Sequence, residues 1–546
     1  MTARAERASP REHEASGEDR PPVSDTPDQQ ACDTSQRSDR PLSPAFVSLG
    51  FFVVAFALRF LAAHLLAGEP VWDGHYYDFG ARRIAEGHGY SDDRVVGGLV
   101  EWHPWCHYPV GYSAYLAAFY RIFGAHGWVA HLANGIAGAL VAVVVYLLGR
   151  EALSERRARL AGAITTVHPG LVLYGALVMS EVLAALTVMT SFWIAVGGPR
   201  VLRTRKIAGV VAGALVLGIG ALVRPQALLC APFLALAIPL APSRAPSRLR
   251  AWAERWSPRA LASVLACVCA LVPVLPWTAR NCRVMDGCAL VSTNAGWNLA
   301  IGAFPRATGR FETLRSSDGC REVTGQVQQD RCWFEYGVAN IKRAPGRWLG
   351  LIPAKLSHTF DHESFAVEYL REARPSEWWE KRRVTWRSTL TAVHGLLVLA
   401  SPFAFVAVVR SRARRRSTSG DQEADCDASA SKARAKEARR RDLTARLVQG
   451  GLFGAVGLGC YVALSGHSPA LWPIVLGACV LAWLPLPGRP VAPPALLLPI
   501  VLLATTAFTH AVFFGEDRYH VVVTPALCLL ASAVLRRNRP AAGYAR

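Results

Sequence analysis

The stretch that decides the fold class is AFVSLGFFVVAFALRFLAAHLL, residues 45–66, which contains a single Lys or Arg, Arg59, and no acid. An apolar run of about 18 residues or more is long enough to cross a membrane as a helix. The run ends at Leu66, and VWDGHYYDFGARRIAEGHGY (71–90) follows almost at once. The sequence therefore predicts a membrane span whose exit carries a carboxylate, Asp73, among aromatic side chains.

Similar apolar runs recur along most of the 546 residues. Hydrophobic residues make up 52% of the chain and charged residues only 18%, where a soluble protein has about 25% charged residues. We therefore predict an all-α polytopic membrane protein with about 12 transmembrane helices. The predicted spans are residues 45–66, 127–149, 159–177, 180–198, 206–223, 226–241, 260–277, 388–409, 447–465, 468–486, 494–514 and 520–535.

The placement of the basic residues predicts which side of the membrane each loop faces. The segments between spans that we assign to the inside, with the C-terminal tail, hold 30 of the 60 Lys and Arg residues, whereas four short outer turns hold only Arg224 and Arg518. This bias matches the positive-inside rule. We expect both termini in the cytoplasm, in the cytoplasmic (inner) membrane of the cell. The net charge of +20 is accounted for in this way, and no nucleic-acid partner is expected.

Composition also predicts the domain organisation. The two halves have no corresponding loops, which disfavours a transporter built from repeats. The residues at 310–387 contain apolar and aromatic groups typical of one or two helices, which we expect to form a lid or acceptor platform. The predicted parts are a disordered cytoplasmic tail (1–43), a catalytic membrane module (44–410) with outer loops 67–126 and 278–387, a basic cytoplasmic linker (411–446), a C-terminal transmembrane module (447–537) and a cytoplasmic tail (538–546).

The first outer loop has the pattern of two amphipathic helices. In YYDFGARRIAEG, Tyr77 and Ile84 fall on one helical face and Arg82 and Arg83 on the other. A second segment, YPVGYSAYLAAFYRIFG (108–124), begins with a proline, which suits the first turn of a helix. Aromatic rings on such helices favour the membrane interface. Two interfacial anchors alone would not account for Asp73.

These segments together resemble a known family. The acid after the first span, YYDFGARRIAEGHGY, HYPVGYSAYLA, HPGLVLYGALVMSEVLAAL (168–186), ALVRPQALL (221–229), PWTARN (276–281), ALVSTNAGWNLAIGAFPRATG (289–309) and FFGEDRYHVVVTPAL (513–527) resemble membrane glycosyltransferases of the GT-C superfamily. The similarity is to the family-39 group, with the protein O-mannosyltransferases and the aminoarabinose transferases of lipid A.

The resemblance implies a reaction on the outer membrane face. A sugar would move, with inversion, from a polyprenyl-phosphate carrier to a lipid, glycan or protein acceptor, with membrane lipids around the enzyme. The acid of the first outer loop, Asp73, would be the general base, because an attacking hydroxyl must lose its proton. Cations would stabilise the leaving phosphate. An oligosaccharide ligase or polymerase, or a lipid or polysaccharide transporter, is the alternative.

Several polar residues on predicted outer ends are candidates for substrate binding. Asp78 is either a second site carboxylate or a surface group, and His75 lines either the pocket or the interface. Glu181 follows Ser180 at a helix start, where an acid is ordinary, and the family often has an acid near there. Arg224, Arg280 and Arg518 have the fork geometry that suits a phosphate, or they extend to lipid headgroups. The substrate-binding candidates are His75, Tyr77, Asp78, Glu181, Arg224, Arg280, Asn294, Asn298, Arg518 and His520, the two asparagines with loop-forming roles as the alternative.

No metal site is predicted, because no paired His and Cys spacing is present and no acidic ligand set can be assembled; a divalent ion is left open. No nucleotide fingerprint is found, so no cofactor is expected. Five of the 13 cysteines lie in the outer loops, where an oxidising compartment allows disulfides. We expect Cys282 to pair with Cys288 and Cys320 with Cys332, which leaves Cys106 unpaired.

Overall fold

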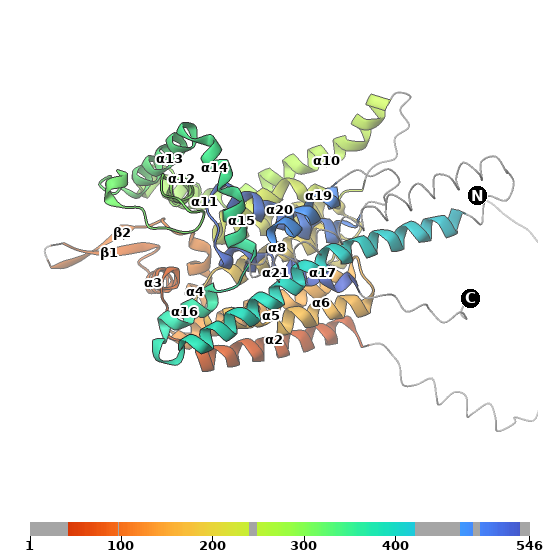
Figure 1. Ribbon diagram of the computed structural model, residues 1–546, viewed down its shortest axis with the longest axis horizontal. Helices are drawn as coiled ribbons and strands as arrows, with labels where there is room; N and C mark the ends of the chain where they lie inside the picture. Colours follow the sequence, from red (N-terminus) through yellow and green to blue (C-terminus); the bar gives the residue numbers. More distant parts are fainter. Residues whose placement is uncertain (1–41, 97, 240–247, 421–469, 484–491, 535–546) are drawn as a thin grey trace, which may run out of the picture. The chain divides into compact units, whose positions relative to one another are not determined.

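The computed structural model describes residues 42–96, 98–239, 248–420, 470–483 and 492–534. The chain divides into two units, residues 1–46 and 47–546. The second unit holds every element described below except the first residues of α2. Its described part is predominantly helical (Figure 1).

The elements are as follows. The α-helices are α2 (Pro44–Leu66), α3 (Asp73–Glu86), α4 (Val110–Phe123), α5 (Gly127–Arg150), α6 (Glu155–Val167), α7 (Pro169–Leu173), α8 (Glu181–Ala195), α9 (Lys206–Val223), α10 (Arg248–Leu271), α11 (Leu275–Val284), α12 (Ala295–Ala303), α13 (Gln326–Arg343), α14 (Pro345–Gly350), α15 (Ile352–Phe360), α16 (Phe365–Ala373), α17 (Glu380–Gly420), α19 (Trp472–Trp483), α20 (Pro494–Val512) and α21 (Thr524–Ala531). The 3-10 helices are η1 (Tyr174–Ala176), η2 (Arg200–Leu202), η3 (Pro225–Ala237), η4 (Ser316–Asp318), η5 (Pro375–Glu377), η6 (Asp517–Val522) and η7 (Ser532–Val534), and the strands are β1 (Ser91–Val96) and β2 (Leu99–Pro104).

Four described helices are long and apolar enough to cross a membrane: α2, α5, α9 and α20. A fifth span results if the bent pair Ser257–Leu271 and Leu275–Val284 is counted as one. The polytopic helical architecture is therefore confirmed, whereas the number of twelve spans is not reached within the described residues. The predicted spans 159–177, 226–241 and 520–535 are broken or 3-10 helical, and the predicted span 447–465 lies outside the described residues.

The break in the third predicted span has a clear physical cause. Pro169 has no amide hydrogen, so α6 ends at Val167 and its last carbonyls lack helical partners. Arg59 of α2 replaces the missing helical donors, because its guanidinium donates to the carbonyls of Thr165 and Thr166 at 3.0 and 3.1 Å. A fully buried arginine in an apolar helix is thereby paired with backbone oxygens, and it fixes α2 against α6.

The segment predicted as the first outer loop, residues 67–126, contains the two predicted helices, α3 and α4, and a feature that we did not predict. Between them β1 and β2 form an antiparallel hairpin, with Ser91 paired to Pro104 and Val96 to Leu99. Its turn is Gly-Gly in the sequence, a dipeptide favoured in two-residue hairpin turns. Arg83 of α3 bonds to Asp93 of β1 at 3.2 Å, which ties the hairpin to the helix.

The segment predicted as the second outer loop, residues 278–387, is more helical than the sequence indicated. Where we expected one or two helices in 310–387, the structure has α13 to α16 as well as short 3-10 helices. Disulfides join Cys282 to Cys288 and Cys320 to Cys332, and Cys106 is free. Both predicted pairings are therefore confirmed.

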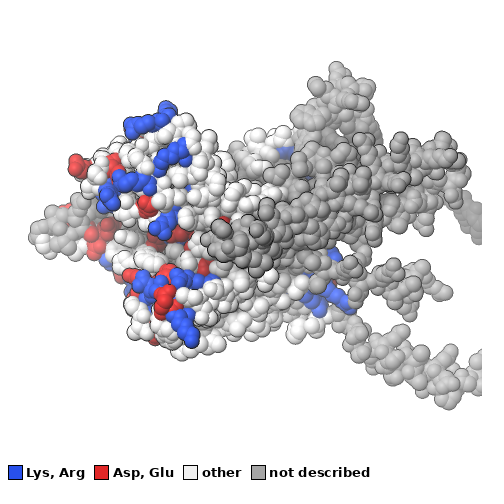
Figure 2. All heavy atoms as spheres, viewed as in Figure 1, with Lys and Arg blue, Asp and Glu red and all other residues white. Residues whose placement is uncertain are grey.

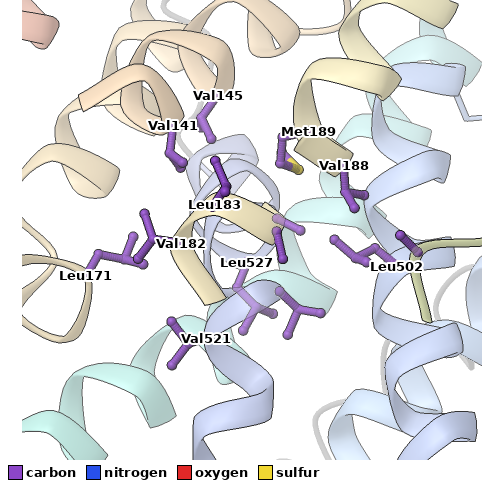
Figure 3. Close-up of a cluster of buried hydrophobic side chains, with 14 of the residues drawn as sticks. Val141, Val145, Leu171, Val182, Leu183, Val188, Met189, Leu502, Val521 and Leu527 are labelled. Carbon is purple, nitrogen blue, oxygen red and sulfur yellow. The ribbon is translucent and has the colours of Figure 1, made fainter. Parts of the chain in front are cut away.

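Helix α8 is surrounded by other apolar helices. In Figure 3, side chains of α5, α7, α20 and α21 lie around it, and the labelled residues are all buried. The labelled residues are Val141, Val145, Leu171, Val182, Leu183, Val188, Met189, Leu502, Val521 and Leu527. This core holds the start of α8, and so Glu181, in a fixed place.

Charged side chains are unevenly spread over the described surface. On the face in Figure 2 they gather around the outer-loop elements α13 and α16 and the beginning of α17. The neighbouring described surface is almost free of charge. An apolar surface beside a charged end is what a helical bundle in a bilayer requires.

Candidate functional site

Asp73 is the first residue of α3, and a sharp reversal places it there. Trp72, the preceding residue, has φ 50°, a left-handed conformation that is rare for a bulky residue. Its ring packs against Phe365 and Tyr369 of α16, with centroids 5.4 and 5.8 Å apart. The contacts compensate the strained backbone, so α3 begins at a defined point.

The Asp73 carboxylate has two partners. Oδ1 accepts a hydrogen bond from the Tyr108 hydroxyl at 2.8 Å, and Oδ2 accepts one from Nη1 of Arg518 at 2.5 Å. Burial favours a higher pKa, but the Arg518 charge and the Tyr108 hydrogen bond outweigh it and lower the pKa of Asp73. The side chain keeps 21% of its surface exposed. The group is therefore an ionised carboxylate that solutes can reach.

Arg518 is shared between two acids and two rings. Its Nε lies 2.5 Å from Oε2 of Glu516, in addition to the contact with Asp73. Its guanidinium lies over the rings of Phe365 and Tyr519, 5.0 and 5.1 Å from their centroids. Burial raises the pKa of Glu516 to about 7 in spite of the arginine. Near neutral pH, Asp73, Arg518 and Glu516 together therefore carry no net charge when Glu516 is protonated and one negative charge when it is ionised.

A second ion pair lies beside the first. Glu181, fully buried at the start of α8, accepts from Nη2 of Arg224 at 2.5 Å. Nε of Arg224 donates to Ser180, whose hydroxyl also lies 3.4 Å from that of Tyr77. Arg224 lies 5.5 Å from the Tyr519 ring centroid, so this ring contacts both arginines.

A pocket extends from Arg224 and Tyr519 between α8, η3, α20 and η6. It encloses about 420 Å³, part of it open to solvent. Its walls are aliphatic except for three threonines, Gln226 and His510. The amide oxygen of Gln226, which lines the pocket, is buried without a hydrogen-bond partner. The pocket thus combines apolar walls with a polar group that has bonding capacity left.

The structure brings together Asp73, Tyr77, Glu181, Arg224 and Arg518 of the predicted residues. Tyr108, Ser180, Glu516 and Tyr519 complete the group, and we did not single them out. Each lies inside a motif quoted for the resemblance, HYPVGYS, MSEV or EDRYH, and position within those motifs was the available signal.

Other predicted residues have different surroundings. Asp78 bonds to Arg82 at 2.8 Å and to the Tyr120 hydroxyl. His75 is exposed and contacts the rings of Tyr76 and Phe79. Among the described residues, the side chains of Asp78 and His75 form no hydrogen bond, ion pair or ring contact with the Asp73 group.

Three further candidates have structural contacts. Arg280 donates to the carbonyls of Tyr90 and Trp105 at 2.7 and 3.0 Å, which joins α11 to the first outer loop. Asn294 precedes α12 and accepts from Ser292, and Asn298 continues that helix. In this structure the Arg280 and Asn294 side chains contact loop residues, whereas Asn298 lies within α12.

His520 also has a different environment from Arg518. Its ring lies in a buried group with Glu363 and His394. Among the described residues, these three are the His, Cys, Asp or Glu side chains placed to hold a metal ion together.

Comparison with known proteins adds a family match. Residues 107–277 match the family model of the dolichyl-phosphate-mannose-protein mannosyltransferases. The matched segment includes Tyr108, Glu181 and Arg224 but neither Asp73 nor Arg518. No curated protein matches the chain.

Two solved structures are similar in outline. The oligosaccharyltransferase of Archaeoglobus fulgidus, tethered with an acceptor peptide, has 14% identity and a TM-score of 0.40 over 89% of this chain and 49% of its own. ArnT from Cupriavidus metallidurans, bound to undecaprenyl phosphate, has 16% identity and a TM-score of 0.34 over 68% of this chain and 73% of its own. The chain spans about half the length of the archaeal enzyme. Over residues 107–277 the chain carries the sequence pattern of the dolichyl-phosphate-mannose-protein mannosyltransferases, and the resemblance that its motifs indicated is confirmed.

Proposed function

We propose that the protein is a membrane glycosyltransferase that moves a sugar from a polyprenyl-phosphate carrier to a hydroxyl acceptor on the outer face of the cytoplasmic membrane. The observation that carries the proposal is the contact between Asp73 and Arg518. In this contact a partly exposed carboxylate at the start of α3, shortly after the apolar helix α2, lies against a guanidinium of η6. The family matched by residues 107–277 is named for a lipid-phosphate sugar donor, which agrees with this chemistry.

The two side chains supply the two charges that the reaction needs. An attacking hydroxyl must lose a proton to a base, and we assign that role to Asp73. The departing lipid phosphate gains negative charge, which a guanidinium stabilises through paired hydrogen bonds. Inversion at the sugar follows from a single displacement, with the acceptor and the phosphate on opposite sides of the anomeric carbon.

The ion pair supports an order of events in which the donor phosphate binds Arg518 before Asp73 acts as a base. Without donor, Arg518 lowers the pKa of Asp73 and makes it a weak base. When a carrier phosphate binds Arg518, the guanidinium turns from the carboxylate to the phosphate. Asp73 then keeps the Tyr108 hydrogen bond and becomes more basic. Donor binding therefore prepares the base for the acceptor.

The test is a transfer assay on purified protein with labelled polyprenyl-phosphate sugars and membrane extracts that supply acceptors. Asp73→Asn keeps the shape of the side chain and removes the base, so transfer should fall by about 10²–10⁴-fold. Asp78→Asn is a matched control, because Asp78 is also on α3 and also bonds to a tyrosine and an arginine. That variant should keep transfer close to the parent's.

Full transfer by Asp73→Asn at normal abundance would refute the role of Asp73 as base. The Asp78→Asn control would then show whether Asp78 is the base instead, and Glu181 would be tested next. Absence of any labelled product from the parent protein with every carrier-linked sugar would count against the transferase itself and favour the transporter alternative.

A further inference from the structure

A second group of buried polar side chains lies where three segments meet. Glu363 is in the loop between α15 and α16, His394 is in α17 and His520 is in η6. Both histidines are 0% exposed and Glu363 is 6% exposed. One ligand atom from each residue lies within 4.8 Å of the other two. The transfer mechanism proposed above uses none of these groups.

Backbone carbonyls define the tautomer of both rings. Nε2 of His394 lies 2.8 Å from the carbonyl oxygen of Phe360, and Nδ1 of His520 lies 2.7 Å from that of Thr359. A carbonyl oxygen only accepts, so these two nitrogens must carry hydrogen. In a neutral imidazole the other nitrogen then has a free lone pair. Nδ1 of His394 and Nε2 of His520 are therefore both acceptors.

Both of these nitrogens lie near a third acceptor, the Glu363 carboxylate. Nε2 of His520 lies 3.1 Å from Oε1 of Glu363, and Nδ1 of His394 lies 3.9 Å from the same oxygen. Nδ1 of His394 has no hydrogen-bond partner in the structure. A proton shared by Glu363 and His520 would satisfy that pair and leave the buried His394 nitrogen unpaired, at a cost of about 1–3 kcal/mol. A cation would satisfy all three.

We propose that Glu363, His394 and His520 bind one divalent transition-metal ion of the Zn²⁺ class. Two imidazoles and one carboxylate are a ligand set that zinc accepts, with ligands about 2.0–2.2 Å from the metal. Ligating histidines usually donate their other ring nitrogen to a carbonyl or carboxylate, as both do here. No short spacing in the sequence indicates the group, because its members come from three distant segments.

His168 lies close by and is not a ligand. Its Nδ1 accepts from the backbone amide of Leu171 at 3.3 Å, so its Nε2 carries the hydrogen and offers no lone pair. A Cβ added at Gly170 would lie 2.8 Å from Oε2 of Glu363. The absence of a side chain at Gly170 therefore leaves room for the Glu363 carboxylate beside α7.

The ion would have a positioning role. His520 is two residues beyond Arg518 in η6, and Asp517 accepts from the amides of Ser364 and Phe365, beside Glu363. Metal binding would therefore join η6 to the α15–α16 loop and to α17. Arg518, which faces Asp73 from the same 3-10 helix, would be held in place as a result.

The experiment measures metal content in the full-length protein, purified in detergent without chelators. Mass spectrometry of the metals should give about one zinc per chain, and Co²⁺ exchanged into the site should have the visible spectrum of a histidine–carboxylate complex. Glu363→Gln and His394→Gln should each lose the metal. His103→Gln is the control, since His103 and Glu101 form a pair on the exposed hairpin, 3.6 Å apart, and it should keep the metal.

A second readout does not depend on the variants folding. Adding Zn²⁺ to chelator-treated parent protein should raise its unfolding temperature, and Mg²⁺ should not. Failure of chelated, folded parent protein to bind Zn²⁺ would refute the site, as would the same metal content in His394→Gln as in the parent. Both readouts are independent of transfer activity, so the metal site and the transferase proposal can fail separately.

Discussion

The Asp73 carboxylate and the Arg518 guanidinium lie 2.5 Å apart although 445 positions separate them in the chain. One follows the first apolar helix and the other begins the last described group of helices. The contact joins the first predicted membrane module, residues 44–410, to the C-terminal one, residues 447–537. Because each group neutralises the other, a change at either one has consequences for both.

Replacing Arg518 should weaken use of the donor. Arg518→Ala removes a charge-assisted contact to the phosphate and leaves Asp73 with only the Tyr108 hydrogen bond. We expect kcat/KM for the carrier-linked sugar to fall by about 10²–10³-fold. Arg518→Lys keeps the positive charge but not the paired hydrogen bonds of the guanidinium, so its kcat/KM should fall less than that of Arg518→Ala. Kinetics at varied donor concentration measure both variants.

The double variant Asp73→Asn, Arg518→Ala tests whether the two residues act together. Residues in contact show non-additive effects. The fold loss of kcat/KM in the double variant should therefore be smaller than the product of the fold losses in the two single variants. Strict multiplication of the two losses would contradict the partner exchange proposed for Arg518.

Donor binding should depend on pH through Glu516. The pKa of this partly buried acid is raised to about 7, so above pH 7 it adds a negative charge beside the phosphate site. The KM for the donor should then rise with pH through 7, by on the order of tenfold, the equivalent of one pKa unit of interaction. Glu516→Gln resembles the protonated acid and should keep the low KM at all pH values.

The same shift has a consequence for stability. Between the ordinary glutamate pKa of about 4.3 and about 7, the folded protein holds a proton that the unfolded chain releases. Stability should therefore decrease as pH rises across this window, and Glu516→Gln should reduce the slope. Glu380→Gln, at an exposed glutamate–arginine pair, should leave both pH profiles as in the parent. A parent KM that is constant from pH 6 to 8 would contradict the role of Glu516.

The sides of the membrane can be tested by labelling. The distribution of Lys and Arg predicts that residues 205 and 415 lie inside and residue 95 outside. In intact cells, and in a background without the free native cysteines, Arg205→Cys and Arg415→Cys should resist an impermeant thiol reagent. Val95→Cys should react. Labelling at residue 415 would reverse the assignment, whatever the outcome of the enzymatic tests.

The sequence was most informative where one rule acts alone. Apolar length predicted α2, α5, α9 and α20 to within a few residues, because the bilayer makes length and apolarity sufficient. Apolar length failed at Pro169, because the missing amide hydrogen ends the helix there although the sequence remains apolar to residue 177. The hairpin β1–β2 was also missed, because its Gly-Gly turn signal is short and lies between two segments with strong helical periodicity.

Asp73, Arg224 and Arg518 were identifiable as candidates because each is a charge beside an apolar run. Their pairing was not, since contacts across hundreds of positions depend on how the helices pack. Tyr519 is the clearest case. Nothing in its spacing indicates a ring that contacts two guanidiniums, yet it joins the two ion pairs.

The last prediction concerns the pair of Glu181 and Arg224, for which the sequence left helix capping and substrate contact as alternatives. Glu181 is fully buried, and the Arg224 side chain is 13% exposed. Glu181→Ala would leave the arginine charge without its partner, which costs about 3–5 kcal/mol, whereas Glu181→Gln keeps a hydrogen-bond acceptor and should cost less. The unfolding temperature should fall accordingly. Glu151→Ala is the control, because Glu151 pairs with a 61% exposed Arg203 and such pairs contribute about 0–1 kcal/mol. Equal stability of Glu181→Ala and Glu151→Ala, together with loss of transfer in the former, would show that Glu181 contacts substrate and does not support the fold.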